Sequence, residues 1–401
     1  MGHWSAAQWF SDFELNQQAL FKWQDRVGCA TAKPVGTLVA SKEIAWYDYA
    51  TLDRDLAMLI ATQGSGKTVQ AQFDMAFHCL KGNPPVVLAP TAEYESQLKP
   101  QSNSVATGRL ALLGLRPEAF PIQSFFPLEA AEQGVALPNP FDQYFSLQER
   151  ELLVGTMLGV DSPAQELAVS MALGMGTENI NAFEQGFRAY KASAEGENVG
   201  QILKMILDVK RRDLFRGKSM DFLGELQAGK ILNVVGGLSG RTGGLARFVA
   251  AYLAVALPKW RREGKIGPAF VVREESSEFL GFLQGQAIVE EEISKQRKSG
   301  LNYLYVLQDL EMAKRTRVYT QMLKACVLRF PALPALHLEN IADCRLLADA
   351  SIAKLMALSG FLGGRPPVHV LVRPDNSVDF YDPFPCLGAF KHVLSGAHEK
   401  S

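Results

Sequence analysis

A glycine-rich stretch early in the chain has the residue types of a phosphate-binding loop. It follows the apolar run Leu56 to Ile60, and Ala61 stands where the usual first glycine would be. Glycines free successive backbone N–H groups to point at the β- and γ-phosphates of a nucleotide, a lysine adds positive charge there, and a threonine hydroxyl can ligate Mg²⁺. We therefore expect ATP and Mg²⁺ as cofactors, bound by Thr62, Gln63, Gly64, Ser65, Gly66, Lys67 and Thr68.

Two adjacent acids could complete such a site for hydrolysis. The apolar run Ala269 to Val272 ends in Arg273, Glu274 and Glu275. In a P-loop ATPase, the strand beside the nucleotide ends in an acid that orients Mg²⁺, followed by one that polarises the attacking water. We expect Glu274 in the first role and Glu275 in the second. The alternative is that both acids are solvated residues at the start of a helix, where the helix dipole favours negative charge.

The elements that must position these residues are those of a parallel sheet. The strand at 56–60, the loop at 61–68, a helical pattern at 69–80 and a second apolar strand at 86–89 form a β-α-β unit, which implies a right-handed crossover. Further strands are expected at 231–235, 269–272 and 303–307, with long helices at 245–262 and 288–298. Near the C-terminus, runs at 368–372 and 378–381 flank a turn and predict a β-hairpin.

The chain between these strands changes character and predicts a division into domains. Helical periodicity at 148–158, 164–173 and 202–214 indicates a mainly helical insertion. The expected parts are an aromatic-rich N-terminal arm at 1–45, a P-loop core at 46–100 and 228–390, the insertion at 101–227 and a C-terminal tail at 391–401. The arm holds three of the five tryptophans, and it either docks on a partner or folds back on its own domain.

Composition narrows the class of protein. Of the 401 residues, 41 are Lys or Arg and 42 are Asp or Glu, which excludes a uniformly basic nucleic-acid coat but not a motor with a basic loop or pore. No apolar run approaches the ~18 residues that a membrane-spanning helix needs. The five cysteines are scattered, which indicates free thiols in a reducing compartment, and the six histidines show no metal-ligand spacing. We expect a soluble cytoplasmic protein without a membrane span.

Four stretches in order give the chain a resemblance to the HerA/FtsK superfamily of P-loop motors, particularly conjugative coupling proteins and type IV secretion ATPases. They are the P-loop, residues 87–94, the acidic strand end at 271–280, and residues 296–301 followed by a strand ending at Gln308. The second stretch is similar to the family's Asp-Pro-x-Gly-Glu-Tyr, with Ala89 and Ala92 in place of the Asp and the Gly. Glu274 stands where the family has Asp.

The resemblance implies a fold of the α/β class, with a RecA-like P-loop NTPase core, a mainly parallel central sheet and an all-α insertion domain. It implies that the chain forms a hexameric ring. This ring would hydrolyse ATP and move DNA in conjugation or type IV secretion. Gln308 would sense the γ-phosphate, and Arg297 would be the arginine finger that reaches a neighbouring subunit's nucleotide. Arg297 could instead be a surface residue of a charged helix. Arg241, in a glycine-rich loop, is a rival for the finger and could equally line a DNA pore.

The partners implied are other copies of the chain, DNA, and a secretion channel or a capsid, at a cytoplasmic location peripheral to a membrane complex. Lys210, Arg211 and Arg212, with Arg216 and Lys218, form the densest basic cluster and are either a DNA contact or a solvated face. A viral or phage genome-packaging ATPase is the alternative within the superfamily. A nucleotide-binding assembly scaffold with weak or no hydrolysis is the alternative from another class.

Overall fold

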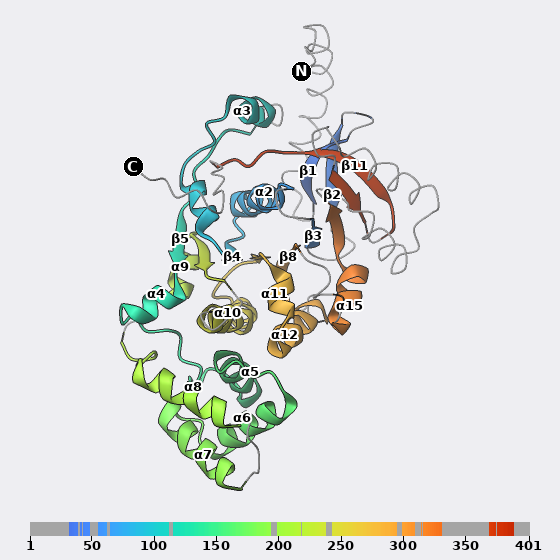
Figure 1. Cartoon of the computed structure of the whole chain (residues 1–401). Coiled ribbons are helices and arrows are strands. Elements are labelled where there is room, and N and C mark those ends of the chain that lie inside the picture. Colours follow the sequence, from blue (N-terminus) through green and yellow to red (C-terminus); the bar gives the residue numbers. More distant parts are fainter. Residues whose placement is uncertain are drawn as a thin grey trace, which may run out of the picture.

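A computed structural model of the chain contains an 11-stranded sheet flanked by helices (Figure 1). The structure describes residues 32–38, 41, 43–48, 55–61, 65–111, 115–193, 199–217, 219–237, 243–294, 299–308, 314, 316–330, 369–373 and 375–388. Its strands are β1 (Ala32–Leu38), β2 (Ile44–Asp48), β3 (Leu56–Ile60), β4 (Pro85–Ala89), β5 (Ile122–Phe125), β6 (Ile231–Val235), β7 (Ala269–Arg273), β8 (Leu301–Leu307), β9 (Val327–Phe330), β10 (His369–Val372) and β11 (Val378–Pro383).

Helices account for most of the remaining described chain. They are α2 (Lys67–Leu80), α3 (Ser104–Ala111), α4 (Pro127–Glu132), α5 (Leu147–Met157), α6 (Pro163–Met175), α7 (Ile180–Ser193), α8 (Val199–Arg211), α9 (Phe222–Gln227), α10 (Gly243–Arg262), α11 (Ser276–Leu280), α12 (Leu283–Ser294) and α15 (Arg317–Ala325), with the 3₁₀ helix η2 (Ala92–Leu98). Among the described residues, no helix is both long and apolar enough to cross a membrane.

The sheet has a parallel part and an antiparallel part. Its strand order is β2-β1-β11-β10-β9-β3-β8-β7-β4-β6-β5, and the seven strands from β9 to β5 are parallel. The four strands from β2 to β10 continue the sheet in antiparallel pairs. The mainly parallel sheet and the C-terminal hairpin, formed by β10 and β11, are therefore confirmed. The predicted strands and long helices are all present, with ends shifted by a few residues; the last residues of the helix expected at 288–298 lie outside the described part.

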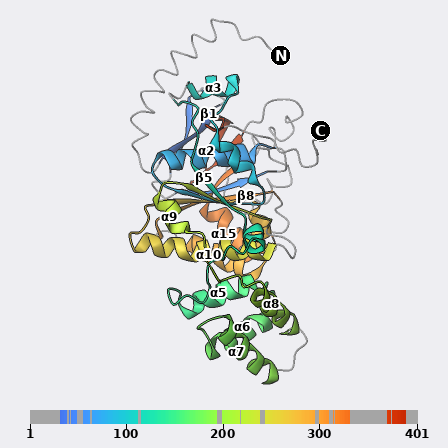
Figure 2. The same cartoon turned by 90° about the vertical axis from the view of Figure 1, so that its left-hand side faces the viewer.

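Helices cover both faces of the sheet because its central strands are buried on both sides. In β3, Leu56, Met58 and Ile60 point into one apolar cluster. Ala57 and Leu59 point into the other. The second cluster is closed by α2 and the first by α10, α11 and α12, and two perpendicular views show the sheet between these layers (Figures 1 and 2). Helices α5 to α8, here called the helical lobe, lie beyond α10 (Figure 2).

Some strands fall outside the parts of the chain in which strands were expected. Strand β1 lies in the expected N-terminal arm and pairs with β2 and β11. Strand β5 lies in the expected insertion at 101–227 and pairs with β6 as an edge of the sheet. The helical lobe itself spans 147–211, inside the expected insertion. The domain boundaries stay predictions.

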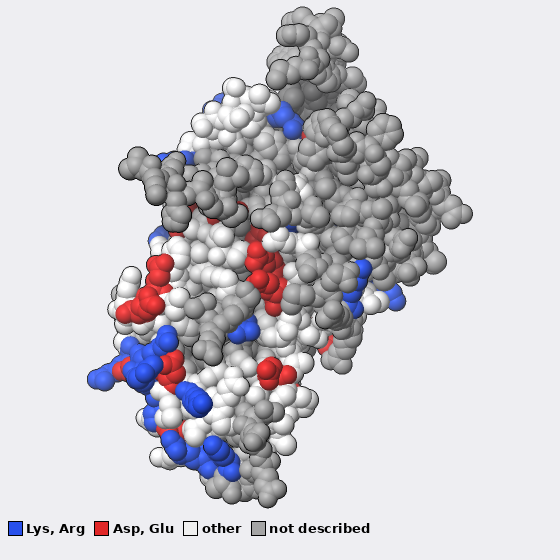
Figure 3. Space-filling view, in the orientation of Figure 1, with Lys and Arg blue, Asp and Glu red and all other residues white. Residues whose placement is uncertain are grey.

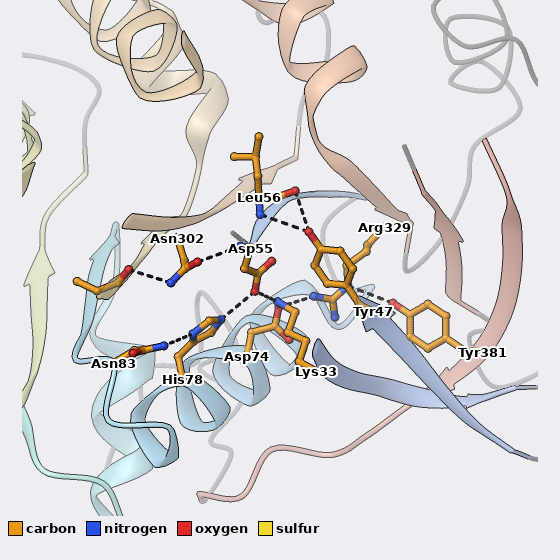
Figure 4. Close-up of polar contacts among 11 residues, drawn as sticks. Lys33, Tyr47, Asp55, Leu56, Asp74, His78, Asn83, Asn302, Arg329 and Tyr381 are labelled. Atoms are coloured by element: carbon orange, nitrogen blue, oxygen red, sulfur yellow. Dashed lines mark hydrogen bonds and ion pairs between the residues drawn. The ribbon is translucent and has the colours of Figure 1, made fainter. Parts of the chain in front are cut away.

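A buried ionic network joins the antiparallel strands to α2 (Figure 4). Lys33 of β1 pairs with Asp55, and its Nζ lies 2.8 Å from Asp74 Oδ2 in α2. Arg329 of β9 pairs with the same Asp74 and donates from Nε to the hydroxyl of Tyr381 in β11 at 3.3 Å. The four charged side chains are 0% exposed. Two cations and two carboxylates thus form a balanced set inside the protein.

His78 of α2 completes this network as a neutral side chain. Burial lowers the pKa of His78, although Asp55 partly opposes the shift. Its Nε2 lies 2.8 Å from Asp55 Oδ2, and a carboxylate only accepts, so Nε2 carries the proton. Burial alone would raise the pKa of Asp55, but Lys33 and His78 outweigh it and hold that pKa below its usual range. The network is therefore charged at neutral pH and fixes α2 against the antiparallel strands.

Removal of one cation from this network should destabilise the protein strongly. We expect Lys33→Met to lower the free energy of unfolding by about 3–5 kcal/mol, because breaking a buried ion pair leaves an uncompensated charge. Urea denaturation followed by tryptophan fluorescence would measure the loss. Lys99→Met, at an exposed position, is the matched control and should change stability little. Equal midpoints for the two variants would contradict the role of Lys33.

Candidate nucleotide-binding site

The P-loop lysine lies at the start of α2, as the glycine-rich sequence requires. Gly66 precedes the helix with a φ of 85°, in the left-handed region that glycine adopts without strain. The loop residues Thr62, Gln63 and Gly64 lie outside the described residues, whereas Ser65 is described and half-buried. Lys67 Nζ donates to the backbone carbonyl of Ala61, at the end of β3, at 2.6 Å. Burial lowers the pKa of Lys67, and the nearby Glu274 and Glu275 oppose that shift. The ammonium group therefore faces both acids.

Glu274 is a buried carboxylate at the end of β7. It is 8% exposed, and the hydroxyl of Tyr94, from η2 after β4, donates to its Oε1 at 2.6 Å. Burial raises the pKa of Glu274 to about 7, while Tyr94 and Lys67 act in the opposite direction. A divalent cation beside this group would favour its ionised form. No role was expected for Tyr94 from its sequence context, although it belongs to the second stretch on which the resemblance rests.

Glu275 has an unusual backbone conformation, which determines the direction of its side chain. Its φ of 48° and ψ of 43° are left-handed, and it is the residue that precedes α11. Non-glycine residues seldom adopt this conformation, and such strain concentrates at functional sites. Gln308 Nε2, just beyond β8, donates to Glu275 Oε1 at 3.1 Å. Burial raises the pKa of Glu275, with Gln308 and Lys67 opposing the shift.

Arg273, the last residue of β7, fixes the end of the strand that carries Glu274 and Glu275. It is 2% exposed and pairs with Glu292 of α12, which also accepts from the hydroxyl of Tyr305 at 2.9 Å. The guanidinium lies 4.4 Å from the centre of the Phe279 ring in α11. The sequence showed Arg273 only as part of a motif, because its partner lies on another element and no local pattern marks the pair. This pair holds α11 and α12 against the strand that carries the acids.

The remaining candidate residues lie away from this cluster or outside the described chain. Arg241 and Arg297 belong to the latter group, so their expected roles stay predictions. The basic cluster at Lys210, Arg211 and Arg212 lies on α8 and just after it, where Figure 3 shows Lys and Arg side chains gathered among acidic ones. Each of the three pairs with an acid of the same lobe, either Glu184 or Asp208.

The donor set fits a magnesium nucleotide. The N-terminus of α2 offers backbone N–H groups and a helix dipole without an acid in its first turn. Lys67 would contact the phosphates, and Thr68 with Glu274 would hold Mg²⁺. Glu275 and Gln308 lie together on the edge of the sheet shared by β3, β8 and β7, where they would face the γ-phosphate.

Comparison with known proteins gives matches in structure. No protein-family model and no curated protein matches the sequence. The structure of VirB4 from Thermoanaerobacter pseudethanolicus is 13% identical, with a TM-score of 0.60 over 88% of this chain and 96% of that chain. The unbound bacterial conjugative coupling protein TrwBΔN70 is 12% identical, with a TM-score of 0.52 over 92% and 93%. The plasmid coupling protein TrwB with a non-hydrolysable GTP analogue is also 12% identical, with a TM-score of 0.50 over 88% and 90%.

At these identities the likeness concerns the fold. The fold is that of the similar structures, VirB4 and the coupling protein TrwB. The predicted α/β class with a RecA-like core and a mainly parallel sheet is thereby confirmed. Within this core, β8 lies between β3, which precedes the P-loop, and the acidic strand β7, and Gln308 just beyond β8 contacts Glu275 beyond β7.

The left-handed backbone at Glu275 can be tested by comparing two variants at this position. We expect Glu275→Gly to be about 1 kcal/mol more stable than Glu275→Ala, because only glycine adopts this conformation without a steric penalty. Urea denaturation measures the difference. The same pair at Lys204, exposed within α8, should show the opposite order. Alanine more stable than glycine at both positions would count against strain at Glu275.

The raised pKa of Glu274 predicts a pH-dependent gain of stability in Glu274→Gln. The folded protein holds a proton on Glu274 up to about pH 7, whereas an unfolded chain releases it near the ordinary value of 4.5. Wild-type stability therefore falls as the pH rises through this window. The variant should match the wild type near pH 4.5 and exceed it by up to about 3 kcal/mol at pH 8.

Melting temperatures from pH 4.5 to 8 would measure this gain. Glu132→Gln, at an exposed position at the end of α4, is the control and should follow the wild type throughout. A Glu274→Gln variant that also parallels the wild type at every pH would contradict the assignment.

Proposed function

We propose that this protein is an ATPase that couples ATP hydrolysis to DNA movement as a ring-forming motor of conjugation or type IV secretion. The observation that carries the proposal is the meeting of Lys67, Glu274, Glu275 and Gln308 at one edge of the parallel sheet. The fold supports it, since the similar structures are VirB4 and a conjugative coupling protein, and the latter protein has been captured with a nucleotide analogue.

Each residue of the cluster has a distinct part in hydrolysis. Lys67 neutralises charge on the β- and γ-phosphates, and Thr68 with Glu274 holds Mg²⁺, which when bound offsets the charge that develops on the phosphate oxygens. Tyr94 fixes the Glu274 carboxylate through its hydrogen bond. Glu275 orients the attacking water and accepts its proton, and the raised pKa of Glu275 suits a general base. Gln308 holds Glu275 and reaches toward the γ-phosphate.

The basic cluster of the helical lobe supports contact with DNA. The side chain of Arg211 is 79% exposed and that of Arg216 is 86% exposed. Their ion pairs with Asp208 and Asp213 are surface pairs of little net stability, so a DNA phosphate can replace the carboxylates. In the proposed ring, which we take to be a hexamer, Arg297 or Arg241 of one subunit would complete the nucleotide site of the next.

ATPase assays test the proposed function directly. We expect wild-type turnover that DNA increases, and a loss of about 100-fold or more in Glu275→Gln, because the general base is removed. Glu132→Gln, which changes the same residue type at an exposed position, should retain wild-type rates with and without DNA.

Two outcomes would redirect the proposal. Absence of wild-type turnover above background, with or without DNA, would overturn the motor and favour a nucleotide-binding scaffold. Turnover that is lost in Glu275→Gln but does not respond to DNA would keep the ATPase and replace DNA by a protein substrate.

A further inference from the structure

The connection between β7 and α11 is only two residues long. Strand β7 ends at Arg273 and α11 begins at Ser276, so Glu274 and Glu275 make the whole turn. Successive strand residues point to opposite faces of a sheet. Arg273 accordingly contacts α12 on one face, whereas Glu274 contacts η2 on the other. Helix α11 packs on the face of Arg273, and the left-handed backbone of Glu275 turns the chain toward that face.

Local hydrogen bonds hold the two sides of this turn. The backbone N–H of Glu274 donates to the carbonyl of Leu88 in β4 at 2.9 Å, so the ladder of the sheet continues to Glu274. The hydroxyl of Ser276 donates to the carbonyl of Arg273 at 2.7 Å. A non-glycine residue keeps a left-handed conformation only where the surrounding structure over-determines it. These two bonds act within the turn, so the place of α11 relative to β7 depends on contacts from further along the chain.

The guanidinium of Arg273 makes those contacts with both of the following helices. It binds the Glu292 carboxylate of α12 with two nitrogens, Nη2 to Oε1 and Nε to Oε2, the latter at 3.2 Å. It also lies 4.4 Å from the centre of the Phe279 ring in α11. The side chains of Arg273 and Glu292 are 2% and 5% exposed. One side chain at the end of β7 thus reaches the helix directly after the turn and the next helix along the chain.

Helix α12 is itself fixed against its neighbours. The hydroxyl of Tyr305 in β8 donates to Glu292 Oε2 at 2.9 Å. Helices α11 and α12 lie against each other (Figure 1), and at Gly285 a Cβ atom would lie 1.9 Å from the backbone oxygen of Phe279. Such a distance leaves room for glycine only. Contacts therefore run from β7 through Arg273 to α12, from α12 to α11, and from α11 back to the turn at Glu275.

The arginine–glutamate pair contributes geometry more than stability. A buried ion pair is costly to desolvate, and an apolar pair of similar volume is often at least as stable. A guanidinium is planar, however, and two parallel hydrogen bonds to a carboxylate set both distance and angle. Apolar side chains in the same place would fill the space without fixing the angle. The residue that would respond to a change of this angle is Glu275, in the two-residue turn.

We propose that Arg273 and Glu292 are positioning residues that hold Glu275 in its left-handed conformation and so aim its carboxylate at the γ-phosphate. The pair itself touches neither the nucleotide nor the attacking water. The part of this inference that concerns hydrolysis rests on the proposed function. The part that concerns the backbone of Glu275 does not, so the two are tested separately.

The backbone part is tested by stability alone. Glu275→Gly and Glu275→Ala are compared in the wild type and in Arg273→Met combined with Glu292→Gln. This neutral double variant leaves no buried charge unpaired and keeps an acceptor for Tyr305, so it should fold. Glycine should have the higher urea midpoint in the wild type, and its advantage should fall to less than about half in the double variant. Arg273→Lys, which lacks the planar fork, replaces the double variant if that protein is unfolded.

The hydrolysis part is tested by ATPase kinetics of the same neutral double variant. Its kcat should fall by about 10-fold to 100-fold, because the base is misaligned. Its KM for ATP should change less than about 2-fold, since Lys67 and the P-loop are untouched. The matched control is Lys259→Met combined with Glu149→Gln, which removes another ion pair, of 2.8 Å, between α10 and α5. The control should keep kcat within about 2-fold and should keep the glycine advantage at Glu275.

The outcomes keep this inference apart from the proposed function. A glycine advantage that is absent from the wild type, or unchanged in the double variant, would overturn the backbone part. An unchanged kcat in the double variant, or an equal loss in the control, would overturn the positioning role in hydrolysis. Absence of wild-type turnover would remove the proposed function and with it that role, whereas the stability comparison would still decide whether the pair holds Glu275.

Discussion

Parallel pairing of four adjacent strands is the constraint on which the candidate site depends. Parallel strands end at the same edge of a sheet, so β3, β8, β7 and β4 deliver their following residues to one place. Lys67, Gln308, Glu275 and Tyr94 come from segments far apart in the chain, and they meet only because of this pairing. Since each strand is buried on both faces, its register is held by side chains of both apolar clusters.

The antiparallel part of the sheet helps to fix α2, the helix that begins at the candidate nucleotide site. Its strands place Lys33 against Asp74, a residue of the helix that begins at Lys67. Arg329, in the strand β9 next to β3, forms an ion pair with the same Asp74. Buried charges are costly unless they are paired, so the position of α2 is defined by ion pairs in addition to apolar packing. The P-loop helix is thus held at its middle while its N-terminus faces the nucleotide site.

The sequence predicted those parts of the fold whose signal is local. Strands β3, β4, β6, β7 and β8 are continuous apolar runs because both of their faces are buried, and Lys67, Glu274, Glu275 and Gln308 stand in recognisable places at the ends of such runs. Strands β1, β2, β5 and β9 escaped prediction, and polar residues such as Lys33, Gln123 and Arg329 interrupt three of these four strands. Their partners are distant in sequence: 41 residues separate Lys33 from Asp74. The Tyr94–Glu274 contact and the left-handed Glu275 likewise follow from tertiary structure.

Glu292 belongs to two neighbourhoods at once. Its carboxylate pairs with Arg273 at the end of β7 and accepts from the hydroxyl of Tyr305 in β8, so α12 is tied to two neighbouring strands. Arg273 is the residue before Glu274, so a displacement of α12 would be felt at the acids. The influence is reciprocal: any free energy that α12 imposes on the end of β7 is returned to α12 in equal measure.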